Sequence, residues 1–204
     1  MNPKITKRDI IINAAIRTFS RKGYYNSRIS DIAEDAKISH GLVYHYFSSK
    51  EQILITIFRD SFEEVLEEMS RIDKKKGTAL DKLKAVITYT FKVVEHNRDL
   101  YKVRIMDVPC IQKFYEPENQ LLYNRYFARL ADFIKEGQQK GLIIKKGAPL
   151  LISHIFHGSV DAVIRQFAYN KEFIYENMSL DLIISQTIDL VFSGFILDTD
   201  FHGN

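Results

Sequence analysis

Apolar residues recur along most of the chain at the three-to-four-residue spacing of an amphipathic helix. Thr6 as N-cap and Gly23 as C-terminal stop delimit the first apolar stripe and predict a helix over 7–22. Ser27 is predicted to cap a second helix, and Ser39 a short third helix that runs through Phe47. The N-terminal part is therefore expected to contain three short helices.

The same pattern continues to the C-terminus. Ser48 and Glu51 form a capping-box pattern that predicts a longer helix over about 50–72. The lysine-rich stretch that follows is expected to be a solvated turn. Further stripes predict helices over 79–96, over 98–108 with Pro109 as its end, from Pro117 to just before Gly141, over 148–169 and over 179–196. The expected fold is all-α, with about nine helices.

The last two predicted helices are apolar around most of their circumference. A small domain cannot easily bury that much apolar surface alone, which favours a homodimer formed through the two C-terminal helices. The alternative is that both helices belong to the core of a larger domain.

Composition supports a folded intracellular protein. Of 204 residues, 46% are hydrophobic and 27% are charged, so the chain can bury a core. The single cysteine, Cys110, excludes an intrachain disulfide and a multi-cysteine metal site, and is expected to be a buried core thiol. A redox role for Cys110 lacks a local cluster of cations. No signal peptide or membrane-spanning segment is expected, which predicts a cytoplasmic protein without a membrane partner.

Charge is distributed unevenly. Residues 1–50 hold nine Lys or Arg and four acidic residues, a net charge of +5, whereas the whole chain carries +3. A basic N-terminal quarter on a near-neutral body is compatible with nucleic-acid binding, although a segment of this charge is not rare.

Residues 27–50 have the pattern of a helix-turn-helix, in which two short helices share a small core and the second enters the major groove. Val43 and Phe47 would face inward. His40, Gly41, Tyr44 and His45 would then lie outward, with Tyr44 and Tyr46 offering hydroxyls to phosphates or base edges. Arg28 and Lys50 would clamp phosphates at the flanks. The alternative is an ordinary helical hairpin with tyrosines on its surface.

These residues resemble the DNA-binding domain of the TetR family of bacterial repressors. The likeness runs from Ile11 through Ile57 and rests on AAIRTFSRKGYYNSRISDIAEDAKIS and GLVYHYFSSKEQIL. It implies an all-α homodimer that binds a palindromic operator. It also implies a helix-turn-helix domain over 1–50 and an effector-binding and dimerisation domain over 51–204.

Carried over by position, the resemblance places DNA contacts on the second and third helices and at the start of the fourth. The predicted DNA-binding residues are Ser27, Arg28, Ser39, His40, Gly41, Leu42, Tyr44, His45, Tyr46 and Lys50. This chain departs from the family pattern twice. Lys37 stands where the turn usually holds Gly, so a left-handed backbone there would be mildly strained. His40 stands where Lys is common, which makes pH-sensitive binding conceivable.

The C-terminal region has a looser likeness to fatty-acid-degradation repressors of the same family, carried by EGQQKGLI (136–143) and FHGSVDAVIRQFAYN (156–170). It implies a long-chain acyl-CoA or fatty acid as effector. Such a ligand needs long apolar walls and cations for its phosphates. The predicted effector-binding residues are Phe91, Tyr101, Ile105, Tyr123, Tyr126, Phe127, Leu130, His157 and Asp161, and the candidate cations are Arg98, Lys102, Arg104, Arg125 and Arg129.

Other functions are weighed on the residues. A helix-turn-helix protein without an effector and a sensor of aromatic or cationic drugs that controls efflux both remain alternatives. An enzyme is not expected, because the chain has no phosphate loop, nucleophile elbow or HExxH motif. His154, His157 and Asp161 share a helical face, but the spacing supplies no fourth ligand, so neither a metal site nor a cofactor is expected.

Overall fold

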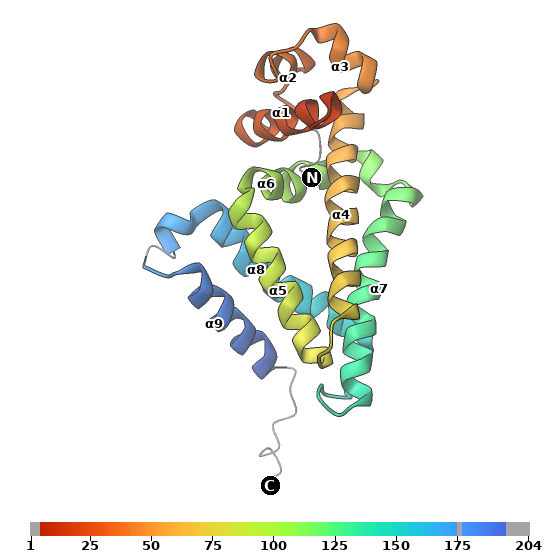
Figure 1. The fold of residues 1–204 in the computed structure, drawn as a ribbon, viewed down its shortest axis with the longest axis vertical. Coiled ribbons are helices and arrows are strands. Elements are labelled where there is room, and N and C mark those ends of the chain that lie inside the picture. The colour runs from red at the N-terminus through yellow and green to blue at the C-terminus, as the bar shows by residue number, and fades with distance from the viewer. Residues whose placement is uncertain (1–4, 175–176, 195–204) are drawn as a thin grey trace. The chain divides into compact units, whose positions relative to one another are not determined.

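The computed structural model describes residues 5–174 and 177–194, and in these ranges it contains nine α-helices, two short 3₁₀ helices and no strand (Figure 1). The prediction of an all-α fold with about nine helices is confirmed. The α-helices are α1 (Lys7–Lys22), α2 (Ile29–Asp35), α3 (His40–Tyr46), α4 (Lys50–Lys74), α5 (Ala79–His96), α6 (Arg98–Met106), α7 (Pro117–Gln139), α8 (Pro149–Ile174) and α9 (Leu180–Ser193). The 3₁₀ helices are η1 (Val108–Cys110) and η2 (Gln112–Tyr115).

The chain forms two compact units. Unit 1 consists of Met1–Glu63 and Asn97–Leu122, and unit 2 of Glu64–His96 and Tyr123–Asn204. Unit 1 therefore joins α6, η1 and η2 to the N-terminal helices, and α4 and α7 each supply residues to both units. These packing units are not the two predicted domains, 1–50 and 51–204, whose division remains a prediction.

Local capping explains where the helices of unit 1 begin and end. The Asp9 N–H donates to Thr6 Oγ1 at 3.2 Å and the Thr6 N–H donates to Asp9 Oδ2 at 2.9 Å, a capping box that opens α1. Gly23, at φ 77°, ends α1 with its N–H on the Phe19 carbonyl. The predicted cap at Ser39 is also confirmed, because its Oγ accepts the Leu42 N–H at 3.2 Å.

Two predicted caps are wrong by one residue. Arg28, not Ser27, precedes α2, and its N–H donates to Asp31 Oδ2 at 2.8 Å. Ser49, not Ser48, caps α4, because its Oγ accepts the Gln52 N–H at 3.0 Å. Runs of neighbouring polar residues leave the register of a cap ambiguous in sequence.

Two predicted helix ends also need correction. The helix α6 ends at Met106, and Pro109 lies inside η1, where early positions of a helix need no N–H donor. The helix α8 extends to Ile174, although Asn170 interrupts its regular geometry at φ −128°, next to the predicted end at 169. The predicted end of the last helix at 196 lies outside the described residues.

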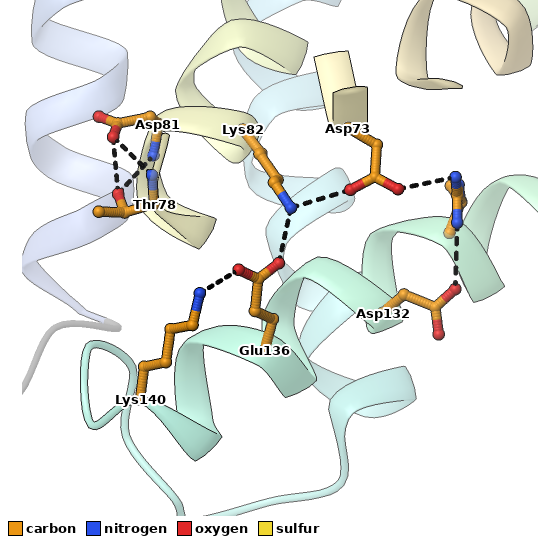
Figure 2. A network of polar contacts seen from close by, with 8 residues as sticks. Asp73, Thr78, Asp81, Lys82, Asp132, Glu136 and Lys140 are labelled. Carbon is orange, nitrogen blue, oxygen red and sulfur yellow. Dashed lines mark hydrogen bonds and ion pairs between the residues drawn. The ribbon is translucent and has the colours of Figure 1, made fainter. Parts of the chain in front are cut away.

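In unit 2, α5, α8 and α9 pack against one another (Figure 1). Leu83 and Phe91 of α5 and Phe167 of α8 are fully buried. A charged network lies among α4, α5 and α7 (Figure 2). Lys82 donates to Asp73 at 2.8 Å and to Glu136 at 2.7 Å, while Arg129 donates to Asp73 at 3.0 Å. Hydrogen bonds to Asp73 and Glu136 raise the pKa of Lys82, so its charge is retained.

Candidate nucleic-acid interface and effector region

The helix α3 exposes a polar aromatic surface. Val43 is fully buried, whereas Tyr44 is 49% and Tyr46 is 40% exposed. His40, Gly41 and His45 are exposed as well. We call His40, Gly41, Tyr44, His45 and Tyr46 the recognition surface. It presents phenol hydroxyls, imidazole rings and a glycine that permits close approach, which are groups that suit phosphate oxygens and base edges.

The turn before α3 has the left-handed backbone that is strained for a residue other than glycine. Lys37 has φ 53°, and it is the one non-glycine residue with positive φ among those described. The Ile38 N–H donates to the Ala33 carbonyl at 3.0 Å and the Lys37 N–H to the Glu34 carbonyl at 3.0 Å. This is a Schellman motif, which requires a left-handed residue at that position. The turn thus keeps the geometry that favours glycine, and Lys37 bears the strain.

Two predicted DNA contacts are engaged inside the protein. Ser27 is buried, and its hydroxyl donates to the Gly23 carbonyl at 2.7 Å. Lys50 Nζ donates to the Tyr24 carbonyl at 2.6 Å and to the Ser27 carbonyl at 2.8 Å. Both side chains are therefore engaged within the protein, and their contacts with DNA stay predictions.

The remaining predicted contacts lie at or near the recognition surface. Arg28 and Ser39 are exposed and flank α2 and α3, while Leu42 is half-buried. Part of the N-terminal positive charge is neutralised locally, because Arg8 pairs with Asp60 at 2.8 Å and Lys22 with Asp31 at 3.0 Å. The Lys22–Asp31 pair is already counted in the net charge of +5 of the first 50 residues, whereas Asp60 lies outside them, so its pairing with Arg8 offsets one of those five charges.

The predicted effector residues are not brought together in one unit. Tyr101 and Ile105 lie on α6 in unit 1, and the other seven lie in unit 2. Phe91 and Leu130 are fully buried in the packed core of unit 2. Asp161 accepts a hydrogen bond from Arg165 at 2.9 Å, as expected for an i,i+4 pair.

Aromatic and histidine rings join α7 to α8 in unit 2. His154 stacks on Phe127 at 4.1 Å between ring centroids, and Tyr123 meets the other side chains through an edge contact with Phe127 at 5.1 Å. The Tyr126 hydroxyl and His157 Nδ1 share a hydrogen bond of 3.0 Å. Four of the residues predicted to bind the effector, Tyr123, Tyr126, Phe127 and His157, thus form one cluster with His154.

The structure also shows a groove that the sequence reasoning missed. It lies between α8 and α9, has a volume of about 560 Å³, and holds none of the predicted effector residues. Its lining is Ile155, Ser159, Val163, Met178, Ile183, Gln186, Thr187, Leu190, Val191 and Gly194. The apolar character of both helices was visible in sequence, but which aliphatic side chains stay exposed, such as Ile155 at 51% and Leu190 at 75%, is seen only in the structure.

The expectation for the cysteine is wrong. Cys110 is exposed, and its Sγ lies 2.9 Å from the Met106 carbonyl oxygen. Across the described ranges, no group of three or more His, Cys, Asp or Glu side chains is arranged to hold a metal ion. In the same ranges, no helix has the length and apolar character needed to cross a membrane.

The fold and the recognition surface define a helix-turn-helix protein. Residues 11–57 match the model of the bacterial regulatory proteins of the tetR family, and residues 58–191 match that of the C-terminal region of YsiA-like proteins. The chain therefore belongs to the TetR family and is a ligand-responsive, DNA-binding transcriptional regulator, as the sequence predicted. Regulators of this family bind DNA operators and act as dimers.

The relatives are transcriptional regulators. The chain is 28% identical over 190 residues to the "Fatty acid metabolism regulator protein" of Bacillus subtilis (strain 168), covering 91% of this chain and 97% of that protein. The crystal structure of the transcriptional regulator FadR from Bacillus subtilis in complex with stearoyl-CoA is similar, with 26% identity and a TM-score of 0.79 over 91% of this chain and 97% of that one. The fatty acid degradation regulator FadR from Bacillus halodurans shares the fold, with 22% identity and a TM-score of 0.81 over 95% of this chain and 98% of that one.

Proposed function

We propose that this protein is a repressor that binds a palindromic operator as a homodimer and is released by a long-chain acyl-CoA or fatty acid. The observation that carries the proposal is the similarity to a regulator bound to stearoyl-CoA, which extends over 91% of this chain. The similarity is thus not confined to the helix-turn-helix, and it includes the helices that would hold the effector.

The chemistry of unit 2 supports an acyl effector. An acyl chain needs long apolar and aromatic walls with few buried donors. The side chains that would form such walls include Phe91, Phe127, Leu130 and Phe133, which are buried on α5 and α7. Arg129 is engaged with Asp73, so the phosphates of an acyl-CoA would need other candidate cations, among which Arg125 is exposed.

The exposed faces of α8 and α9 support dimerisation through the two C-terminal helices. Large aliphatic side chains are exposed on both helices: Leu150, Leu151, Ile155, Leu182 and Leu190. Apolar surface of this kind beside a groove marks an interaction site. A second copy of α8 and α9 would cover it and place two recognition helices on one operator.

The helix α4 offers a route from effector to operator, because one continuous helix carries residues of both units. An effector that displaces α4 would change the spacing of the two recognition helices in the dimer. Effector and operator would then weaken each other's binding by the same factor. The proposal includes no catalytic step and no cofactor, and it places the protein with the chromosome in the bacterial cytoplasm.

Thermal unfolding tests the effector class. Palmitoyl-CoA, palmitate, free CoA and a panel of aromatic cations are added separately to the purified protein. Saturation of a site at about 100 times its dissociation constant adds roughly 2.7 kcal/mol to stability. We expect palmitoyl-CoA to raise the melting temperature and free CoA to leave it unchanged.

Two other results of the thermal unfolding experiment would each replace the acyl effector by an alternative. A shift with aromatic cations alone would replace the acyl effector by a drug of the efflux-sensor class. The absence of any shift, together with intact operator binding, would favour a helix-turn-helix protein without an effector.

A further inference from the structure

The turn between α1 and α2, residues 23–28, is held from two sides within unit 1. It leads directly into α2, whose Ile32 and Ala33 are buried in the same small core as Val43 of α3. A displacement of this turn is therefore transmitted to α3 through packed side chains.

On one side, the segment from α6 to η1 supplies acceptors to α1 and the turn. Asp107 Oδ1 accepts the Tyr24 N–H at 3.2 Å. The Tyr25 hydroxyl donates to the Cys110 carbonyl at 2.8 Å, and the Ser20 hydroxyl donates to Asp99 Oδ1 at 2.7 Å. These contacts join residues at least 79 positions apart in the sequence.

On the other side, Lys50, the first residue of α4, donates hydrogen bonds to the backbone of the turn. Lys50 Nζ donates to the carbonyls of Tyr24 and Ser27 and lies 4.3 Å from the centroid of the Tyr24 ring. Tyr24 thus donates its N–H to the Asp107 carboxylate, and its carbonyl oxygen accepts a hydrogen bond from the Lys50 ammonium. Both polar groups of one peptide segment are fixed by long-range partners.

The two charges that hold Tyr24 also act on each other. Burial raises the pKa of the Asp107 carboxyl, and the hydrogen bond from Tyr24 and the charge of Lys50 partly oppose the rise. Burial lowers the pKa of the Lys50 ammonium, and the charges of Asp107 and Asp31 partly oppose that fall. Both charged groups are half-buried, and their contacts with Tyr24 and with each other offset part of the cost of their lost solvation.

We propose that Asp107 is a positioning residue for DNA recognition: together with Lys50 it fixes the α1–α2 turn at Tyr24, and through α2 it sets the orientation of the recognition surface. Asp107 lies on the segment after α6, outside the helix-turn-helix, and acts through Tyr24. Lys50, which the sequence predicted as a phosphate clamp, has the matching role from α4.

The test exploits a difference in sign. Removing a carboxylate makes a protein more positive, and by charge alone this strengthens binding to DNA. Loss of positioning weakens binding to the specific site and leaves non-specific phosphate binding intact. The matched control is Asp132→Ala, which also removes one carboxylate, here an exposed partner of Arg129 in unit 2.

The experiment measures affinities for two duplexes, one selected from a random library by the wild-type protein and one of scrambled sequence. The ratio of the two affinities does not depend on the fraction of folded protein. We expect Asp107→Ala to lower this ratio about tenfold at a temperature well below its melting temperature. Asp132→Ala should leave the ratio within about twofold.

A second variant separates the hydrogen bond from the charge. Asp107→Asn keeps a carbonyl oxygen for the Tyr24 N–H and should retain most of the wild-type ratio. A ratio in Asp107→Ala that equals that of Asp132→Ala would overturn the proposal. A loss in Asp107→Asn as large as in Asp107→Ala would overturn the assignment of the role to the Tyr24 hydrogen bond.

Discussion

Two surfaces of this protein expose side chains that proteins usually bury, and their chemistry is opposite. The recognition surface on α3 presents Tyr44 and Tyr46, whose rings end in hydroxyls. The faces of α8 and α9 present aliphatic side chains, such as Leu190, beside a groove of about 560 Å³. Aromatic hydroxyls can exchange water for phosphates and base edges, whereas aliphatic groups gain only from leaving water.

The comparison indicates how each surface should respond to substitution. The aliphatic surface should be sensitive to an added charge and tolerant of changes in shape. The recognition surface should be sensitive to the loss of a single polar atom. Substitutions at Leu190 and Tyr44 test this difference directly, and those at Lys82 and Asp31 set it against ion pairs within the protein; the four are given from the largest expected effect to the smallest.

Leu190→Asp should weaken dimerisation by more than about a hundredfold, because it places a carboxylate in an interface that has to be desolvated. Sedimentation equilibrium measures the effect. Leu121→Asp is the matched control, since Leu121 is an exposed leucine on the part of α7 in unit 1. Equal dimerisation of Leu190→Asp and wild type would remove α8 and α9 from the interface.

Lys82→Ala should lower the free energy of unfolding by about 2 kcal/mol. The Lys82 side chain is only 12% exposed and balances both Asp73 and Glu136. These carboxylates remain partly exposed, so solvent keeps the cost below that of a fully buried charge. Urea unfolding measures the effect, with Lys140→Ala, which removes the exposed partner of Glu136, as control. An equal, small loss in both variants would show that the network is not stabilising.

Tyr44→Phe should weaken operator binding about fivefold and leave the melting temperature unchanged, because the Tyr44 side chain is exposed and its hydroxyl is predicted to contact DNA. Fluorescence anisotropy with a selected duplex measures it. Tyr115→Phe removes another exposed hydroxyl, which donates to the Pro109 carbonyl, and serves as control. Wild-type affinity in Tyr44→Phe would mean that the hydroxyl makes no contact.

Asp31→Asn should show a small, pH-dependent loss of stability. Hydrogen bonds from the Arg28 N–H and then from Lys22 hold the pKa of Asp31 below its ordinary 3.8. A lowered folded pKa contributes stability above the unfolded pKa, and that contribution is lost as pH falls through the folded value. The difference in melting temperature between wild type and Asp31→Asn should therefore shrink from about pH 5 downward. A constant difference would contradict this assignment.

Whether a contact could be predicted from the sequence depends on how far apart its two residues lie along the chain. The caps at Thr6 and Ser39 involve partners three residues away, and both predictions were correct. The roles of Lys50 and Ser27 depend on where distant backbone carbonyls lie, which no local pattern reveals. Lys50 reaches the Tyr24 carbonyl across 26 positions of sequence, so its charge alone could not reveal this internal contact.

The same distinction explains which features of unit 2 could be predicted from the sequence. Its helices follow from apolar periodicity, and the strong apolar character of α8 and α9 was visible in sequence. The groove between them was not, because it arises from which side chains the packing leaves uncovered. Likewise, Cys110 was predicted to be buried because a cysteine thiol is usually part of the core, but it lies in the short helix η1 and is exposed.

Operator affinity with and without palmitoyl-CoA tests the account most directly. The duplex is one selected by the wild-type protein, and free CoA at the same concentration is the control. We expect saturating palmitoyl-CoA to weaken operator binding at least about tenfold, and the duplex to weaken palmitoyl-CoA binding by the same factor. If palmitoyl-CoA binds but leaves operator affinity unchanged, the protein is not a repressor released by this effector.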